Sequence, residues 1–426
     1  MTEMQGSSVS FLRPERAGAF SFAVTPVMLT AMLVGALILP RFALTFGQRE
    51  LSATVVISLI SVAVLAVTGE LRLNPIRVGL FCLAIAAMLL SAMLGAGARN
   101  SVASFALLVC LYTAFLFVLR DGDGHFEVTL RVFRFLAFLI AIAGICQFVG
   151  QFAIHGETLF TFEGLLPDAI LSHGFNYVIP MGIGDLNKAN GFFLVEPSAF
   201  SQLMALAIIV EFAFFQPSWR MAVLGLAMLL AYSGTGLILF VIFVPALLVH
   251  RGHGRLVLLA VAGAFALAVF SDSLHLTALM DRVRDFSSDR SSAFARFLSP
   301  FYLFHDFIFP HVQTTLFGLG PGAIELFFNQ LEYEVHDPTW GKLFFEYGVV
   351  GTVPFVAFVC YCIFVNARSY WLSGAMFLNY LILGGNLVDA RIQTLMLVLV
   401  VFPNTSPVGI TQEAHRRLGE YASGTF

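Results

Sequence analysis

The sequence predicts an all-α membrane protein: a polytopic transmembrane helical bundle of about 12 spans, with partly helical loops outside the membrane. Hydrophobic residues make up 58% of the 426 residues. Charged residues make up 12%, whereas an ordinary soluble domain carries about 25%. Apolar runs of transmembrane length also recur along the chain. A soluble fold of this length cannot hide so much apolar surface, so we expect lipid to surround most of the chain.

Most predicted spans are apolar runs long enough to cross about 30 Å of hydrocarbon. They lie at residues 20–39, 51–68, 76–96, 102–119, 131–153, 197–216, 255–271, 348–366 and 370–388. Three further segments are less clear, at 221–233, 234–249 and 391–403. The residues Ser233-Gly234-Thr235-Gly236 separate the first two of these. A single helix over 221–249 would be about 43 Å long, so we predict two helices that meet at this break.

The arginines predict the orientation of the spans. With the N-terminus in the cytoplasm, most arginines fall on the inner side, as the positive-inside rule requires. The short outer loops hold only Arg41, Arg49, Arg99 and Arg391. We therefore expect one integral membrane domain over 1–426, both termini in the cytoplasm, and two long outer loops at 154–196 and 272–347. The first apolar run is expected to be a retained helix, because no small-residue cleavage site accompanies it.

The second long loop contains four arginines within fifteen residues, Arg282, Arg284, Arg290 and Arg296. Guanidinium groups at the bilayer surface could bind an anionic group such as a lipid-linked diphosphate, because their planar fork suits bidentate contacts with phosphate. The alternative is that they pair with Asp281, Asp285 and Asp289 on a solvated interfacial helix. The residue types alone leave both interpretations open.

Glu196 ends the first long loop, directly before Pro197 and Ser198. Proline is favoured in the first turn of a helix, so this carboxylate is predicted to stand at a helix N-terminus at the membrane edge. Its position favours a capping role. A carboxylate held at that point could also orient a hydroxyl group or accept its proton.

His336 and Asp337 precede a helix that is expected to start near Trp340. A histidine beside a carboxylate could take the proton of an attacking sugar hydroxyl. The alternative is an interfacial histidine that caps a helix. His305 and His311 do not have the i, i+4 spacing of a zinc helix, so no metal site is expected.

Three other features carry no predicted chemistry. The glycines at Gly318, Gly320 and Gly322 suggest a phosphate loop, but no GK[ST] follows them and no strand precedes them, so a turn is predicted. The five cysteines lie inside apolar runs without a CxxC pair, which is typical of core residues. A net charge of −3 argues neither for nor against nucleic acid, and no nucleic-acid partner is expected.

Several short motifs follow one another along the chain. They are Asn190-Gly191-Phe192-Phe193-x-x-Glu196-Pro197-Ser198, Ser233-Gly234-Thr235-Gly236, Ser291-Ser292-Ala293-Phe294-Ala295-Arg296-Phe297, Gly318-x-Gly320-x-Gly322, and His336-Asp337 followed by Glu346-Tyr347-Gly348-x-x-Gly351-Thr352. In this order they resemble the O-antigen polymerase and ligase superfamily. The Glu-Pro-Ser motif is most similar to Wzy-type polymerases of O-antigen, capsule or exopolysaccharide. The motifs cover residues 185–352, and the rest of the chain is similar in hydropathy alone.

The resemblance implies an inverting, metal-independent glycosyltransferase without a cofactor. It would polymerise undecaprenyl-diphosphate-linked oligosaccharide repeats into a surface polysaccharide, on the periplasmic side of the bacterial inner membrane. It also implies two partners, a chain-length regulator and a flippase. Carried over to this sequence, His336 and Glu196 would be catalytic, Arg290 and Arg296 would bind the diphosphate with Arg282 and Arg284 as further partners, and Lys188, Asn190, Asp337 and Trp340 would contact the saccharide.

Two departures from the family pattern bear on function. In ligases the histidine is followed by Asn, Ser or Gln, whereas Asp337 follows His336 here, and Gly348 comes one residue late. Both departures argue against an alternative function, a ligase that transfers polymer to lipid A core or to protein. Lys188 stands where related sequences often have Arg, which keeps the charge and loses the planar fork. A further alternative to the polymerase is a transporter or flippase, which would tend to place ionisable groups at the bilayer midplane.

Overall fold

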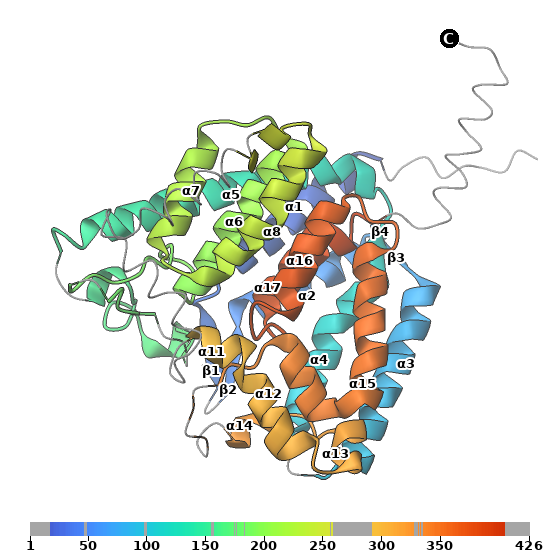
Figure 1. Ribbon diagram of the computed structural model, residues 1–426. Helices are drawn as coiled ribbons and strands as arrows, with labels where there is room; N and C mark the ends of the chain where they lie inside the picture. The colour runs from blue at the N-terminus through green and yellow to red at the C-terminus, as the bar shows by residue number, and fades with distance from the viewer. Residues whose placement is uncertain are drawn as a thin grey trace, which may run out of the picture.

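The structure is a computed structural model. It describes residues 18–404 apart from 47–48, 98–99, 155–156, 174, 176, 183, 256, 259–291, 328–330, 332 and 334. Most described residues are helical, and the helices run between two ends of a bundle (Figure 1). We name these ends after Glu196, which precedes α6 (Pro197–Phe214), and Arg220, which begins α7 (Arg220–Leu230). The Arg220 end is uppermost in Figure 1.

Several helices begin at polar residues whose side chains satisfy the first free backbone N–H groups. Asn74 precedes α3 and accepts hydrogen bonds from two backbone N–H groups, at 3.0 and 3.2 Å. Ser101 precedes α4 and accepts one at 3.2 Å. These caps are local features of the sequence, and they agree with the predicted starts of the runs at 76–96 and 102–119.

The described chain is mostly helical, which is consistent with the expected all-α membrane fold. Two short antiparallel ribbons, β1–β2 at the Glu196 end and β3–β4 at the Arg220 end, were not predicted. The second ribbon shortens the predicted span at 102–119, because α4 stops at Thr113 and the chain continues through a 3-10 turn, η1, into β4. Strand pairing satisfies the backbone groups of these connections. The elements of this half are α1 (Gly18–Leu37), β1 (Ala43–Phe46), β2 (Arg49–Ser52), α2 (Ala53–Val67), β3 (Leu71–Leu73), α3 (Pro75–Leu94), α4 (Val102–Thr113), η1 (Ala114–Leu116), β4 (Phe117–Leu119) and α5 (Gly122–Gly150).

The break at 233–236 separates two helices, as predicted, since α7 ends at Leu230 and α8 (Gly234–His250) follows. Between them Tyr232 has a φ of 47°, which is outside the helical range. The Leu230 carbonyl accepts a hydrogen bond from Ala189 at the Glu196 end. Arg251, directly after α8, donates to two carbonyls at the end of α6. The two helices therefore form a hairpin that turns at the Glu196 end.

The central helix is α6, which contacts α5, α7, α8 and α16 and is buried along most of its length. It packs against α8 at Gly236, where an added Cβ would lie 2.4 Å from the carbonyl oxygen of Ser201. Only glycine allows the two backbones to approach so closely.

The C-terminal part of the bundle contains α15 (Thr339–Phe364) and α16 (Tyr370–Leu381), followed by α17 (Ala390–Met396) and η7 (Leu397–Val401). α15 begins before the predicted run at 348–366, with Gly348 in its interior at a φ of 58°. The uncertain segment 391–403 reaches the Arg220 end, where the carbonyls of Phe402 and Pro403 accept hydrogen bonds from Leu119 and Arg368. It therefore connects both ends of the bundle.

The described parts of both long loops lie at the Glu196 end. In the first loop, the Leu194 carbonyl accepts a hydrogen bond from Arg41, which follows α1. In the second, Gln313 donates to the Leu94 carbonyl at the end of α3, at 2.8 Å. The helical segments of these loops are η2 (Glu157–Leu159), η3 (Asp168–Ile170), α11 (Ser292–Phe297), α12 (Ser299–Leu303), η5 (Phe304–Ile308), α13 (Val312–Phe317) and α14 (Ile324–Phe327).

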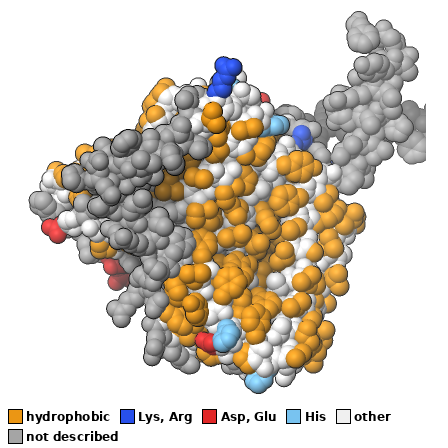
Figure 2. All heavy atoms as spheres, in the orientation of Figure 1, with side chains coloured by type: hydrophobic (Ala, Val, Ile, Leu, Met, Phe, Trp, Pro, Cys, Tyr) orange, Lys and Arg blue, Asp and Glu red, His pale blue; other side chains and the backbone are white. Residues whose placement is uncertain are grey.

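The outer surface of the bundle is apolar. Four described helices are long and apolar enough to cross a membrane, namely α3, residues Gly124–Gly150 of α5, α6 and α15, and shorter apolar helices accompany them. Figure 2 shows hydrophobic side chains gathered over the described part of this face, between the two ends. Val241 and Val353, in the middle of α8 and α15, are 63% and 60% exposed. Water would not tolerate such a surface, so the chain is a membrane protein, and the number and orientation of its spans stay predictions.

Candidate functional site

Glu196 occupies the position before α6, with Pro197 in the first turn, as the sequence predicts. Its carboxylate makes no capping hydrogen bond to the helix backbone. Instead Oε2 accepts a hydrogen bond from the Ser198 hydroxyl at 3.0 Å and lies 3.8 Å from Nη2 of Arg296. The side chain is 32% exposed. The backbone of Glu196 therefore starts the helix, while its carboxylate faces a cation from the other long loop.

Arg296, on α11, is the one arginine of the predicted cluster that the described part of the chain contains. Arg282, Arg284 and Arg290 lie outside the described residues. The Arg296 side chain is 11% exposed, and Nη1 donates to the Leu383 carbonyl at 3.4 Å. Leu383 belongs to the connection between α16 and α17, so three distant parts of the chain meet at this guanidinium group.

His336 lies beside Arg296 because its backbone N–H donates to the Ala295 carbonyl at 3.0 Å. The side chains of His336 and Asp337 are half-buried. Asp337 Oδ2 forms an ion pair with Lys342 Nζ at 2.9 Å. Its other oxygen lies against Gly385, where an added Cβ would approach it to 2.8 Å. The structure thus brings together the motifs around 196, 296 and 336 at one end of the bundle.

Residues 28–319 match the sequence model of the WcaD colanic acid polymerase family. The matched range is more than half of the 426-residue chain and includes Glu196 and Arg296. The chain belongs to this family. Membership confirms the resemblance to Wzy-type polymerases and supports an exopolysaccharide polymerase role. No curated protein matches the chain.

Two buried ionisable residues of α15 support the site of this WcaD-family chain. Lys342 and Glu346 are one helical turn apart, and they are 7% and 1% exposed. Glu346 accepts a hydrogen bond from the backbone N–H of Gly322, and its backbone carbonyl accepts one from Gly320 at 2.9 Å. The glycine-rich segment is therefore a turn, as predicted, and its positive φ values of 71°, 97° and 75° let it wrap around the kink of α15.

The start of α8 also joins the site. The Thr235 hydroxyl donates to the Ser198 carbonyl at 3.5 Å, and the Ser201 hydroxyl donates to the Ser233 carbonyl at 3.3 Å. The Ser-Gly-Thr-Gly break is thus placed directly against the Glu-Pro-Ser motif. Small side chains at this point allow the close approach of α6 and α8 that positions Glu196.

The predicted saccharide contacts occupy different environments. Asn190 is fully buried, and its amide group bonds with Gln147 at 2.8 Å and with the Tyr177 carbonyl at 2.9 Å, so in this structure it holds the first loop together. Lys188 Nζ lies 5.9 Å from the centre of the Tyr232 ring, beside the α7–α8 turn. Trp340 packs against the aromatic rings of α12 and η5. Their contacts with sugar stay predictions.

Arg41, which was not predicted as part of the site, supports the first long loop. It is 2% exposed, and it donates from Nε to the Leu194 carbonyl and from Nη1 to the Phe160 carbonyl, both at 2.8 Å. The rings of Phe162 and Tyr177 lie 5.2 and 4.6 Å from its guanidinium carbon. Burial lowers the pKa of Arg41 to about 10, and the nearby Tyr177 acts in the opposite direction. The one available signal was an arginine in a short segment that was predicted to lie outside, where basic residues are few.

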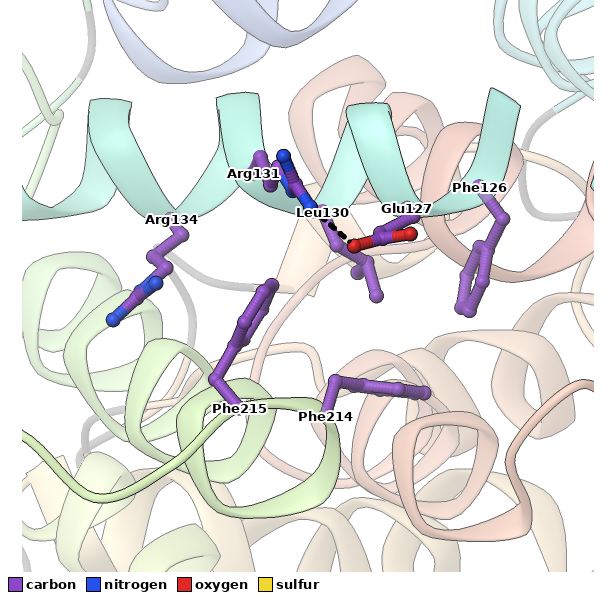
Figure 3. A pocket seen from close by; sticks show the side chains of 7 residues that line it. All are labelled: Phe126, Glu127, Leu130, Arg131, Arg134, Phe214 and Phe215. Atoms are coloured by element: carbon purple, nitrogen blue, oxygen red, sulfur yellow. Dashed lines mark hydrogen bonds and ion pairs between the residues drawn. The ribbon is translucent and has the colours of Figure 1, made fainter. Parts of the chain in front are cut away.

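A cavity lies at the opposite end of the bundle. It has a volume of about 520 Å³ between the start of α5 and the end of α6, and its lining is Phe126, Glu127, Leu130, Arg131, Arg134, Phe214 and Phe215. Figure 3 shows α5 on one side of it and the two phenylalanines that end α6 on the other. The length of α6, about 27 Å, separates it from Glu196, so it is not part of the site described above. The described residues contain no group of three or more His, Cys, Asp or Glu side chains placed to hold a metal ion.

Proposed function

We propose that this chain polymerises undecaprenyl-diphosphate-linked oligosaccharide repeats into a surface polysaccharide, on the periplasmic side of the bacterial inner membrane. The observation that carries the proposal is that Glu196 Oε2 lies 3.8 Å from Arg296 Nη2. The backbone N–H of His336 also donates to the carbonyl of Ala295, the residue before Arg296. A carboxylate, a guanidinium group and an imidazole from separate loops supply what a glycosyl transfer from a diphosphate carrier needs. The WcaD family description supports this chemistry.

In the proposed reaction, the growing chain moves from its lipid carrier to a hydroxyl group on the next lipid-linked repeat. The bond between the anomeric carbon and the diphosphate breaks, and a bond from the acceptor oxygen to the same carbon forms. Arg296 stabilises the negative charge that develops on the departing diphosphate, a role that many transferases give to a metal ion. In this proposal Arg296 takes the place of a metal ion, and a single displacement by the acceptor oxygen inverts the configuration at the anomeric carbon.

The acceptor proton passes to Glu196 or His336. We favour Glu196, because its carboxylate is partly exposed and so is accessible to an acceptor hydroxyl. In an inverting transfer the base and the leaving group lie on opposite faces of the anomeric carbon. The side chains of Glu196 and Arg296 would therefore separate when a sugar binds between them. The diphosphate would then replace Glu196 as the ion-pair partner of the guanidinium group.

The deciding experiment is the saccharide profile of a deletion strain, complemented with the wild-type chain or with Arg296→Ala. The proposal predicts loss of long polymer, with single lipid-linked repeats retained on the periplasmic face, and no recovery with Arg296→Ala at normal protein levels. Long polymer accumulating on its carrier would instead indicate a ligase. Repeats trapped on the cytoplasmic face would indicate a transporter.

A further inference from the structure

A small cavity lies directly beneath the Glu196 segment, between α1, α6, α16 and α17. Its lining is Leu37, Leu194, Ala199, Gln202, Leu203, Leu206, Asn379, Arg391, Ile392 and Leu395. Its volume is about 10 Å³, which is room for one water molecule. Most of the lining is apolar, so the three polar side chains, Gln202, Asn379 and Arg391, decide what the cavity can bind.

Two of these polar groups are buried and need a partner. Asn379 is 2% exposed and Arg391 is 8% exposed. Among the described residues, neither Oδ1 of Asn379 nor Nε of Arg391 has a hydrogen-bond partner. Nη2 of the same guanidinium group donates to Asp389 Oδ2 at 3.0 Å. Burying a donor and an acceptor without partners is unfavourable, so the cavity favours a ligand that accepts one hydrogen bond and donates another.

We propose that this cavity binds one water molecule, which accepts a hydrogen bond from Arg391 Nε and donates one to Asn379 Oδ1. The third polar group, the Gln202 amide, offers its oxygen to the remaining water hydrogen. Its nitrogen already donates to the Leu383 carbonyl at 3.2 Å. A single water thus satisfies both buried atoms with three partners, the usual number for an internal water.

The water connects the core of the bundle to the site. The Leu383 carbonyl that accepts from Gln202 also accepts from Arg296, at 3.4 Å. Hydrogen bonds would then connect Arg391 to the water, the water to Gln202, and Gln202 through the Leu383 carbonyl to Arg296. The water therefore holds the connection between α16 and α17 in the position that receives Arg296. This inference does not depend on the proposed function, because it concerns the binding of water and the stability of the bundle.

The first test is a structure of the full chain in lipid nanodiscs, at a resolution that shows ordered waters. We expect density within hydrogen-bond distance of both Arg391 Nε and Asn379 Oδ1. A map that shows other internal waters but none in this cavity would overturn the proposal.

The second test compares two substitutions of one residue by thermal unfolding in the same lipid. Asn379→Leu removes the acceptor and fills the cavity, which leaves the Arg391 donor unsatisfied, so its unfolding midpoint should fall by several degrees. Asn379→Asp keeps an acceptor oxygen beside the guanidinium group, and its midpoint should equal or exceed that of the wild type. If Asn379→Leu is as stable as the wild type, or if both variants lose the same amount, the proposal is wrong.

Discussion

Replacing Lys342 by Met removes the only lysine among the described residues of α15 and tests the buried charges beneath His336. Lys342 Nζ lies 2.9 Å from Asp337 Oδ2, and the two side chains are 8% and 27% exposed. Removing one partner from a fully buried ion pair costs about 3–5 kcal/mol. Asp337 is partly screened by solvent, so we expect about 2–3 kcal/mol for this pair. Met fills a similar volume, so the loss reflects charge rather than a cavity.

The substitution should also lower activity, because the ion pair fixes Asp337, and Asp337 follows the histidine that is bonded to Ala295. We expect a lower unfolding midpoint and less long polymer in cells, measured at equal protein levels; a tenfold loss of polymerisation rate would correspond to about 1.4 kcal/mol of transition-state stabilisation lost through misplacement of Asp337. Lys342→Arg should retain most of the stability and most of the polymer yield, since it keeps the charge.

The matched control is Arg131→Met, which breaks an ion pair with Glu127 that is 66% and 69% exposed, at the other end of the bundle. An exposed pair of this kind contributes about 0.3–0.5 kcal/mol, so the control should unfold close to the wild type. The double variant Lys342→Met with Asp337→Asn should recover part of the lost stability, because the stranded charge is then removed. Equal midpoints for Lys342→Met and Arg131→Met would refute the reasoning.

Four further predictions concern the site itself. Arg296→Ala should abolish long polymer while the protein inserts normally, and Arg296→Lys should recover only part of it because the planar fork is lost; full-length polymer in Arg296→Ala would remove the assigned role. Glu196→Gln should insert and unfold normally, because the carboxylate makes no capping bond, yet it should lose activity; normal polymer would assign the proton to His336. EDTA should leave polymer formation by purified protein unchanged, and a clear loss would indicate a required cation. Arg41→Gln should lower both stability and activity, since two carbonyl contacts and two aromatic contacts are weakened, whereas a normal unfolding midpoint would show that Arg41 does not hold the first loop.

Features that depend on neighbouring residues could be predicted from the sequence. Apolar composition identifies a membrane protein, because lipid exposure requires apolar side chains whatever the helix order. The break at 233–236 and the position of Glu196 before Pro197 follow from glycine and proline chemistry within a few residues. The two ribbons were missed because hydropathy does not distinguish a short strand from the end of an apolar helix, as the run at 102–119 shows.

The contacts of the site were decided by the tertiary structure alone. Glu196 and Arg296 are far apart in the sequence, and Arg41 and Leu194 are separated by 153 residues. The position of Glu196 in the sequence favours a helix cap. In the folded chain its carboxylate instead faces the guanidinium group of Arg296. The connection around Leu383 was not predicted as part of the site, because its contribution is a backbone carbonyl that every residue possesses. The membrane environment, most of the helices and the polar residues at their ends follow from composition and from neighbouring residues. Packing of the small residues of α6 against α8, and of α15 against its glycine-rich turn, determines which of those polar residues meet.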